Sequence, residues 1–127
     1  MTVSEPTMLG VSVATHAKLK RLKEDGHFKE MADAYRFAIG LALAQGQIPP
    51  EVSASTTVFS VATIDPDQSI RKAVQTILAD HVEGSSIYKM AERLAEWGLQ
   101  ELSDQADRGE IDVVTLFDQL KMVGSPG

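Results

Sequence analysis

The segment at residues 27–46, HFKEMADAYRFAIGLALAQG, constrains the fold more than any other part of the chain. Its apolar residues recur at intervals of three and four, which predicts a helix. A second apolar line lies beside the first, so the apolar arc is wider than the stripe of an ordinary surface helix. The first line comprises Phe28, Met31, Ala32, Tyr35, Ala38, Ile39 and Ala42, and the second comprises Ala34, Phe37 and Leu41.

Many residues of this segment are small, and Gly40 lies in the middle of the predicted helix. Because Gly costs about 1 kcal/mol relative to Ala inside a helix, we expect a backbone or a bulky side chain to pack against Gly40. The helix could be the centre of a single core, or it could lie at an interface with another chain. The wide arc favours the interface, which would comprise Phe28, Met31, Ala34, Tyr35, Phe37, Ala38, Gly40 and Leu41.

Composition narrows the class of protein. A chain of 127 residues predicts one domain, and the absence of cysteine excludes disulfides and thiol catalysis. No apolar run reaches the roughly 20 residues that a membrane-spanning helix needs. The N-terminus MTVSEPTMLG lacks the basic and apolar regions of a signal peptide. We therefore expect a cytoplasmic protein that does not enter a membrane.

Charge is distributed unevenly along the chain. Residues 1–50 carry six Lys or Arg and five Asp or Glu, whereas the remaining residues carry six against thirteen. The acidic C-terminal part repels phosphate, so a DNA-binding surface would have to lie in the first fifty residues. The densest set of candidate phosphate contacts there is Lys18, Lys20, Arg21, Lys23 and Lys29.

The rest of the pattern predicts a mainly α chain, with about five helices and two short strands in a single domain, residues 1–127. Residues 8–46 read as strand, helix, turn and helix. Pro49 and Pro50 end the second helix of this part, and they lie in a predicted linker at residues 47–55. Residues 56–121 read as one strand followed by helices. The predicted strands are 8–14 and 56–64, and the predicted helices are 16–25, 27–46, 65–80, 87–107 and 111–121.

Local signals mark several helix ends. Thr15 is the predicted N-cap of the first helix, and Gly26 follows its last turn. Asp65 is predicted to cap the third helix with Pro66 in its first turn, and Ser86 to cap the fourth.

Chemical motifs are scarce. No two of the three histidines have the spacing of metal ligands on one helix face, and the sequence contains no phosphate-binding loop, dinucleotide-binding motif or serine-hydrolase motif. The carboxylates alternate with Lys and Arg, as on an ordinary solvated surface. We therefore expect no catalytic residues, no metal site and no cofactor.

Residues 8–46 resemble a ribbon-helix-helix protein in the order of their elements. The resemblance implies that two chains pair their strands into a ribbon that enters the major groove of DNA. Neither face of the strand contains the Arg, Lys, Asn or Gln that read base edges, so the resemblance supports a dimer better than it supports DNA contact. The residues that would face the bases are either Met8, Gly10 and Ser12 or Leu9, Val11 and Val13.

A second resemblance covers residues 26–121. Its pattern consists of GHFK at 26–29, AYRFAIGLA at 34–42, FSV at 59–61 ahead of Asp65, and AEWGL at 95–99. This pattern is similar to a group of small bacterial accessory proteins encoded in DNA phosphorothioation and other anti-phage defence islands. The resemblance implies an accessory subunit and identifies no catalytic residues.

Taken together, the sequence favours a non-enzymatic accessory or adaptor subunit that acts through protein contacts, either as a homodimer or with a larger partner. The alternative is a dimeric ribbon-helix-helix regulator that binds double-stranded DNA.

Overall fold

A computed structural model of the chain describes residues 7–52, 55–82 and 86–109. Within these ranges the protein is mainly helical and contains one two-stranded antiparallel sheet. The elements in chain order are β1 (Met8–Ser12), α1 (Val13–Glu24), α2 (Met31–Ala44), β2 (Ser55–Ser60), α3 (Val61–Ile64), α4 (Ser69–Ile77), α5 (Ala79–Val82) and α6 (Ile87–Asp107).

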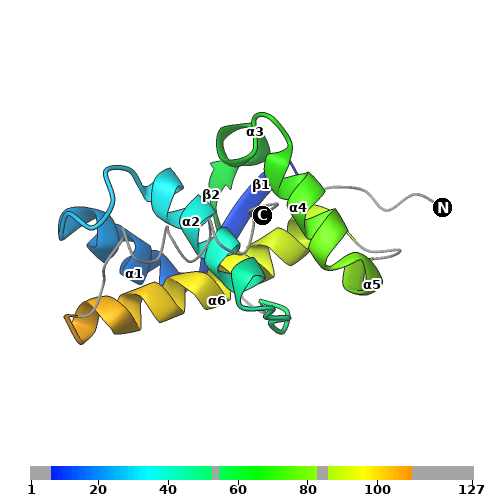
Figure 1. Cartoon of the computed structure of the whole chain (residues 1–127). Helices are drawn as coiled ribbons and strands as arrows, with labels where there is room; N and C mark the ends of the chain where they lie inside the picture. Colours follow the sequence, from blue (N-terminus) through cyan, green and yellow to red (C-terminus); the bar gives the residue numbers. More distant parts are fainter. Residues whose placement is uncertain (1–6, 53–54, 83–85, 110–127) are drawn as a thin grey trace.

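The long helix α6 organises the other elements. It extends along the molecule beneath α1 and α2 (Figure 1) and contacts α1, α2, α4 and β1. Its most extensive contact is with α2. Buried hydrophobic residues from all five of these elements form one contiguous core.

The described residues contain more helices than the sequence predicts for them, because two of the helices are short. The described residues contain six helices, of which α3 and α5 have four residues each. The predicted helix at 111–121 lies outside the described residues. Within the predicted linker at 47–55, residues 47–52 belong to no helix or strand, and residue 55 is the first residue of β2.

Both strands end earlier than predicted, for the same reason. The Ser12 hydroxyl accepts a hydrogen bond from the Thr15 backbone N–H at 3.2 Å, so Ser12 and not Thr15 is the N-cap of α1. The Ser60 hydroxyl likewise accepts from the Thr63 N–H at 3.1 Å, and the predicted strand 56–64 turns into α3. A serine that can cap a helix competes with continuation of the strand.

Asp65 caps α4, but more residues separate Asp65 from the start of this helix than the sequence predicts. Its two carboxylate oxygens accept from the backbone N–H groups of Ile70 at 2.9 Å and Arg71 at 3.0 Å. The helix α4 itself starts at Ser69, so Pro66 does not occupy its first turn. The predicted cap at Ser86 is confirmed, since its hydroxyl accepts from the Lys89 N–H at 3.1 Å.

The strand β1 pairs with β2 of its own chain. Leu9 lies opposite Phe59 and Val11 opposite Thr56, and the register shifts between Leu9 and Gly10. The ribbon-helix-helix resemblance implied pairing with the same strand of a second chain, and this implication is corrected here.

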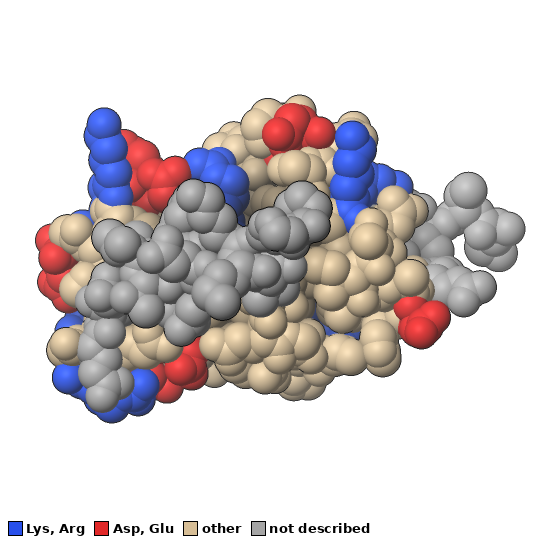
Figure 2. Space-filling model, in the orientation of Figure 1, with Lys and Arg blue, Asp and Glu red and all other residues tan. Residues whose placement is uncertain are grey.

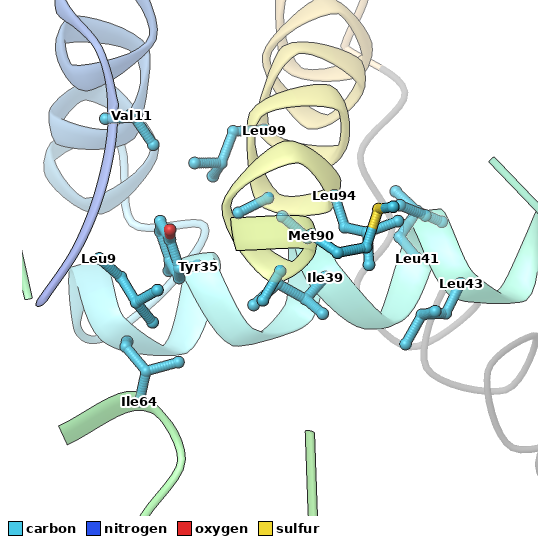
Figure 3. Packing of buried hydrophobic residues seen from close by; sticks show 14 of the residues in the cluster. Leu9, Val11, Tyr35, Ile39, Leu41, Leu43, Ile64, Met90, Leu94 and Leu99 are labelled. Carbon is cyan, nitrogen blue, oxygen red and sulfur yellow. The ribbon is translucent and has the colours of Figure 1, made fainter. Parts of the chain in front are cut away.

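The wide apolar arc of α2 faces the protein's own core. Ala34, Tyr35, Ala38 and Leu41 are at most 1% exposed and Phe28 is buried. Figure 3 shows Tyr35 pointing from α2 toward β1, while Met90 and Leu94 of α6 lie beside Ile39 and Leu41 of α2. The central-core interpretation is therefore correct for these residues. Met31, Phe37 and Gly40 are only partly buried.

The expected packing against Gly40 stays a prediction, whereas a close backbone approach occurs at Gly98. Gly98 of α6 lies against Ala38 of α2, and a Cβ on Gly98 would come within 2.6 Å of the Ala38 carbonyl carbon. The two helices therefore touch backbone to backbone, which only a residue without a side chain allows. The small residues of α2 serve this internal contact.

We expect Gly98→Ala to lower the free energy of unfolding by about 1–3 kcal/mol or more, because the added methyl group overpacks a site that backbone atoms fill. Urea unfolding followed by circular dichroism measures the loss. Asp104→Ala on the exposed side of the same helix is the control, and it should change stability by less than about 0.5 kcal/mol. An unchanged or higher midpoint for Gly98→Ala would contradict the packing described here.

Candidate functional site

Side chains from two helices close the edge of β1 that faces away from β2. In an antiparallel pair, the N–H and C=O of one residue point to the same edge of the strand. The Gly10 N–H donates to Glu92 Oε2 of α6 at 2.8 Å, and the Tyr35 hydroxyl of α2 donates to the Gly10 carbonyl at 2.9 Å. Both backbone groups of Gly10 are therefore satisfied by side chains.

Glu96 performs the same role one helical turn further along α6. Its Oε1 accepts from the Ser12 backbone N–H at 2.7 Å and its Oε2 from the Ser12 hydroxyl at 2.9 Å. Thr15 Oγ1 and Gln100 Nε2 also donate to Oε2. The carboxylate thus holds together the end of β1 and the start of α1, where the helix dipole favours negative charge.

The four donors to Glu96 are all neutral groups. Burial raises the pKa of Glu96, but the hydrogen bonds from Ser12, Thr15 and Gln100 lower it by more, so the pKa lies below its ordinary value. Glu96 therefore remains ionised, and within the described residues no Lys, Arg or His forms an ion pair with it. Glu92 differs, because Lys89 Nζ lies 3.5 Å from its Oε1.

A groove opens beside Glu96, with a volume of about 280 Å³. We call it the Trp97 groove. Its floor and one wall come from α6 and the end of β1, and its other wall comes from the loop after α2. The lining residues are Ser12, Pro49, Pro50, Glu51, Val52, Glu96, Trp97 and Gln100.

The loop wall of the groove is fixed to α6. Arg93 Nε donates to the Pro49 carbonyl at 2.7 Å, and Pro49 is buried. Proline restricts the backbone of this wall further, because its ring fixes φ. Glu51, by contrast, is exposed at the mouth. The wall of the groove at Pro49 is therefore held in place, and one exposed acidic side chain, Glu51, also lines the groove.

Exposed apolar residues are sequence neighbours of the groove lining. Val13 follows Ser12 and is 70% exposed, and Ile48 precedes Pro49 and is 44% exposed. Large apolar side chains on a surface, next to a cleft with an aromatic wall, are typical of a protein-contact surface.

A second hollow, of about 660 Å³, lies between α3, α4 and α6. The Tyr88 hydroxyl donates to Asp65 Oδ2 at 2.8 Å, and the Arg71 guanidinium lies 5.8 Å from the centre of the Tyr88 ring. Burial, then the bond to Asp65, raises the pKa of Tyr88 to about 12. Because Asp65 already accepts from Tyr88 and from two backbone N–H groups, we assign this cluster to the cap of α4.

The basic residues predicted to contact phosphate lie on and after α1, but several have acidic neighbours. Arg21 lies 3.4 Å from Asp107 and 3.9 Å from Asp25, and Lys23 lies 3.9 Å from Glu30. Figure 2 shows one face of the molecule, where the blue and red groups occur close together. Lys20 and Lys29 are exposed, whereas Lys18 is partly buried.

The strand residues proposed to face DNA bases do not form a free surface. Leu9 and Val11 are at most 1% exposed, and Gly10 is buried. Ser12 is bonded to Glu96, which leaves Met8 and Val13 as the exposed members of the two sets.

Sequence reasoning missed the roles of Glu92, Glu96 and Trp97 in this region. Glu92 and Glu96 are four residues apart and therefore share a face of α6, which was the available signal. The bonding partners of both carboxylates lie more than eighty residues earlier, so their role depended on the fold.

In the described part of the chain, no three His, Asp or Glu side chains are grouped so that they could hold a metal ion. None of the helices described is both long enough and apolar enough to span a membrane. No protein-family model, curated protein or solved structure matches the chain.

We expect Glu96→Gln to lower the free energy of unfolding at pH 7 by about 1–3 kcal/mol, because a buried donor loses its charged acceptor. The folded-state pKa of Glu96 lies below the ordinary 4.5, so its contribution is present above that pH and is lost as the pH falls through the folded value. The difference between wild type and Glu96→Gln should therefore shrink below pH 4.5.

Urea unfolding at pH 7 and at two acid pH values measures this effect, with Glu101→Gln as the control. Glu101 lies on the same helix, where its carboxylate accepts a hydrogen bond from Gln105, one turn further along. A stability difference for Glu96→Gln that did not change with pH would contradict the assigned role.

Proposed function

We propose that the protein is a non-enzymatic accessory or adaptor subunit that binds a larger protein through the Trp97 groove and the apolar residues beside it. The observation that carries this proposal is a contrast between two sets of side chains, the buried polar groups and the residues at the Trp97 groove. The buried polar groups hold the fold together, while an aromatic residue and two prolines line one groove, and two exposed aliphatic residues, Val13 and Ile48, are chain neighbours of its lining residues.

Three carboxylates of the described residues are occupied by structural bonds. Glu92 and Glu96 accept from the backbone of β1, and Asp65 accepts from the backbone of α4. No buried side-chain nitrogen or oxygen in the described residues lacks a hydrogen-bond partner. General acid–base catalysis needs a group that is free to exchange a proton with a substrate, and these groups are committed elsewhere.

The proposed partner is a different protein chain and not a second copy. Most of the residues that suggested a homodimer are buried within one chain, so most of that predicted interface faces the chain's own core; Met31, Phe37 and Gly40 are the partly buried exceptions. The similarity of residues 26–121 to accessory proteins of bacterial defence and DNA-modification islands extends the proposal to that setting. The pattern residues AYRFAIGLA and AEWGL meet where Ala38 lies against Gly98, which is consistent with a shared core.

We expect the double variant Val13→Asp/Ile48→Asp to weaken the complex with the partner by at least about tenfold, because charge replaces the apolar contact. Candidate partners are the proteins encoded beside this gene, co-expressed with the tagged chain and weighed by native mass spectrometry. The matched control is Ile77→Asp on α4, which is 50% exposed and distant in sequence from the groove lining.

Thermal melts should show that all three substitutions leave the fold intact, since each replaces an exposed side chain. Asp at position 13 also suits the first turn of α1. Equal weakening by Val13→Asp/Ile48→Asp and by Ile77→Asp would contradict the proposed surface. A partner-free homodimer in light scattering would contradict the proposed heteromeric assembly.

The DNA-binding alternative has less support. The pairing of β1 with β2 leaves the strand without a ribbon partner, and the acidic neighbours of Arg21 and Lys23 lower the positive potential of α1.

We expect no saturable binding to duplex DNA between roughly 50 and 200 mM salt, since phosphate contacts supply most of such affinity and two of the five candidate cations, Arg21 and Lys23, lie beside carboxylates. Fluorescence anisotropy with a labelled duplex measures this. The same measurement is made on the double variant Lys20→Gln/Arg21→Gln, which removes two of the candidate phosphate contacts. Binding whose salt slope fell by about 0.9 per neutralised contact in that variant would establish the alternative instead.

A further inference from the structure

We infer that the Trp97 groove receives a cationic side chain, an arginine, from the partner protein. This inference rests on the proposed docking function and adds the chemistry that the groove selects. It starts from the composition of the lining, which contains two carboxylates, one indole and one amide but no Lys, Arg or His.

The size of the groove suits one side chain. Small-molecule sites in proteins usually have volumes of roughly 300–1,000 Å³. At about 280 Å³, this groove lies just below that range. A single long side chain presented by a partner fits it better than a nucleotide or a large cofactor does.

The electrostatics of the groove favour a cation. Glu96 remains ionised because its pKa lies below the ordinary value, and its four hydrogen-bond donors carry no charge. Three of these donors bond Oε2, whereas the Ser12 N–H is the only donor to Oε1 from the part of the chain that the structure describes. A carboxylate oxygen has two lone pairs, so Oε1 can accept one more hydrogen bond.

Two positive groups near the groove oppose this field, and one negative group adds to it. The N-terminus of α1 at Ser12 carries partial positive charge, and Arg93 donates from its Nε to the Pro49 carbonyl. Arg93 is not part of the lining, whereas Glu51 adds a second full negative charge at the mouth. The balance within the lining itself is therefore negative.

The indole of Trp97 selects the type of cation. Tryptophan has the strongest attraction among aromatic residues for a cation placed over its ring, and arginine is the more frequent partner. A guanidinium can stack on the indole while one edge donates to a carboxylate, which an ammonium group cannot do in the same way. Trp97 and Glu96 are adjacent on α6 and both line the groove, so they offer both contacts.

The test uses the isolated full-length chain and a short acetylated, amidated peptide, Gly-Arg-Gly. Trp97 is the only tryptophan, so its indole N–H gives a single NMR signal that reports directly on the groove. We expect this signal to shift and saturate with a dissociation constant of roughly 0.1–10 mM, as for a single anchored side chain. The matching peptide with citrulline, which keeps the shape but loses the charge, should bind at least about tenfold more weakly.

Two variants complete the design. Glu51→Gln lies in an exposed loop and should weaken binding of the arginine peptide about two- to fourfold without altering the fold. Glu101→Gln, a charge change on α6 outside the groove lining, should leave binding unchanged. Higher salt should weaken binding of the arginine peptide as well.

The inference is overturned if the Trp97 signal does not move up to about 10 mM peptide, or if the arginine and citrulline peptides bind equally. Equal effects of Glu51→Gln and Glu101→Gln would also overturn it. Because this titration needs no partner protein, the absence of peptide binding would not change what the co-expression experiment shows about the docking function. Conversely, failure to form a complex would refute the docking function even if the groove bound arginine.

Discussion

Glu92 and Glu96 of α6 bond the outer edge of β1, and the rest of the structure depends on this interaction. An edge strand exposes a row of backbone groups that invites pairing with another chain. Here Glu92 accepts from Gly10 and Glu96 accepts from Ser12, while Tyr35 donates to the Gly10 carbonyl. Burial, Glu92 and Glu96 together raise the pKa of Tyr35 well above its ordinary value, so its hydroxyl keeps the proton that it donates.

This arrangement ties the two ends of the described chain together. The strand at the N-terminal end is held by carboxylates from the last described helix, and Gly98 lets that helix lie directly against α2. Backbone contact between α2 and α6 sets how closely α6 packs against the rest of the core. This close packing in turn places Glu92 and Glu96 at hydrogen-bond distance from β1.

The Trp97 groove is a consequence of the same geometry. Glu96 reaches β1 from one side of α6, so the adjacent Trp97 is turned toward the loop after α2, where Arg93 holds Pro49 in place. A structural carboxylate whose bonding partners are all neutral leaves its charge available to the groove. Structure and proposed recognition therefore share one residue without requiring it to change its bonds.

The sequence by itself determined the local features: the mainly α class, the long helix after Ser86, the loop after the paired prolines and the approximate helix positions. These follow from periodicity, capping and proline, which act between residues close in the chain. It could not determine which faces meet. The wide arc of α2 was compatible with an interface and with a core, and the sequence pattern favoured the interface. Only the tertiary structure decided for the core, because α6 supplies Gly98 against Ala38. Likewise, Glu92 and Glu96 acquired their role from Gly10 and Ser12, which are more than eighty residues away, and such distant pairing leaves no local signal.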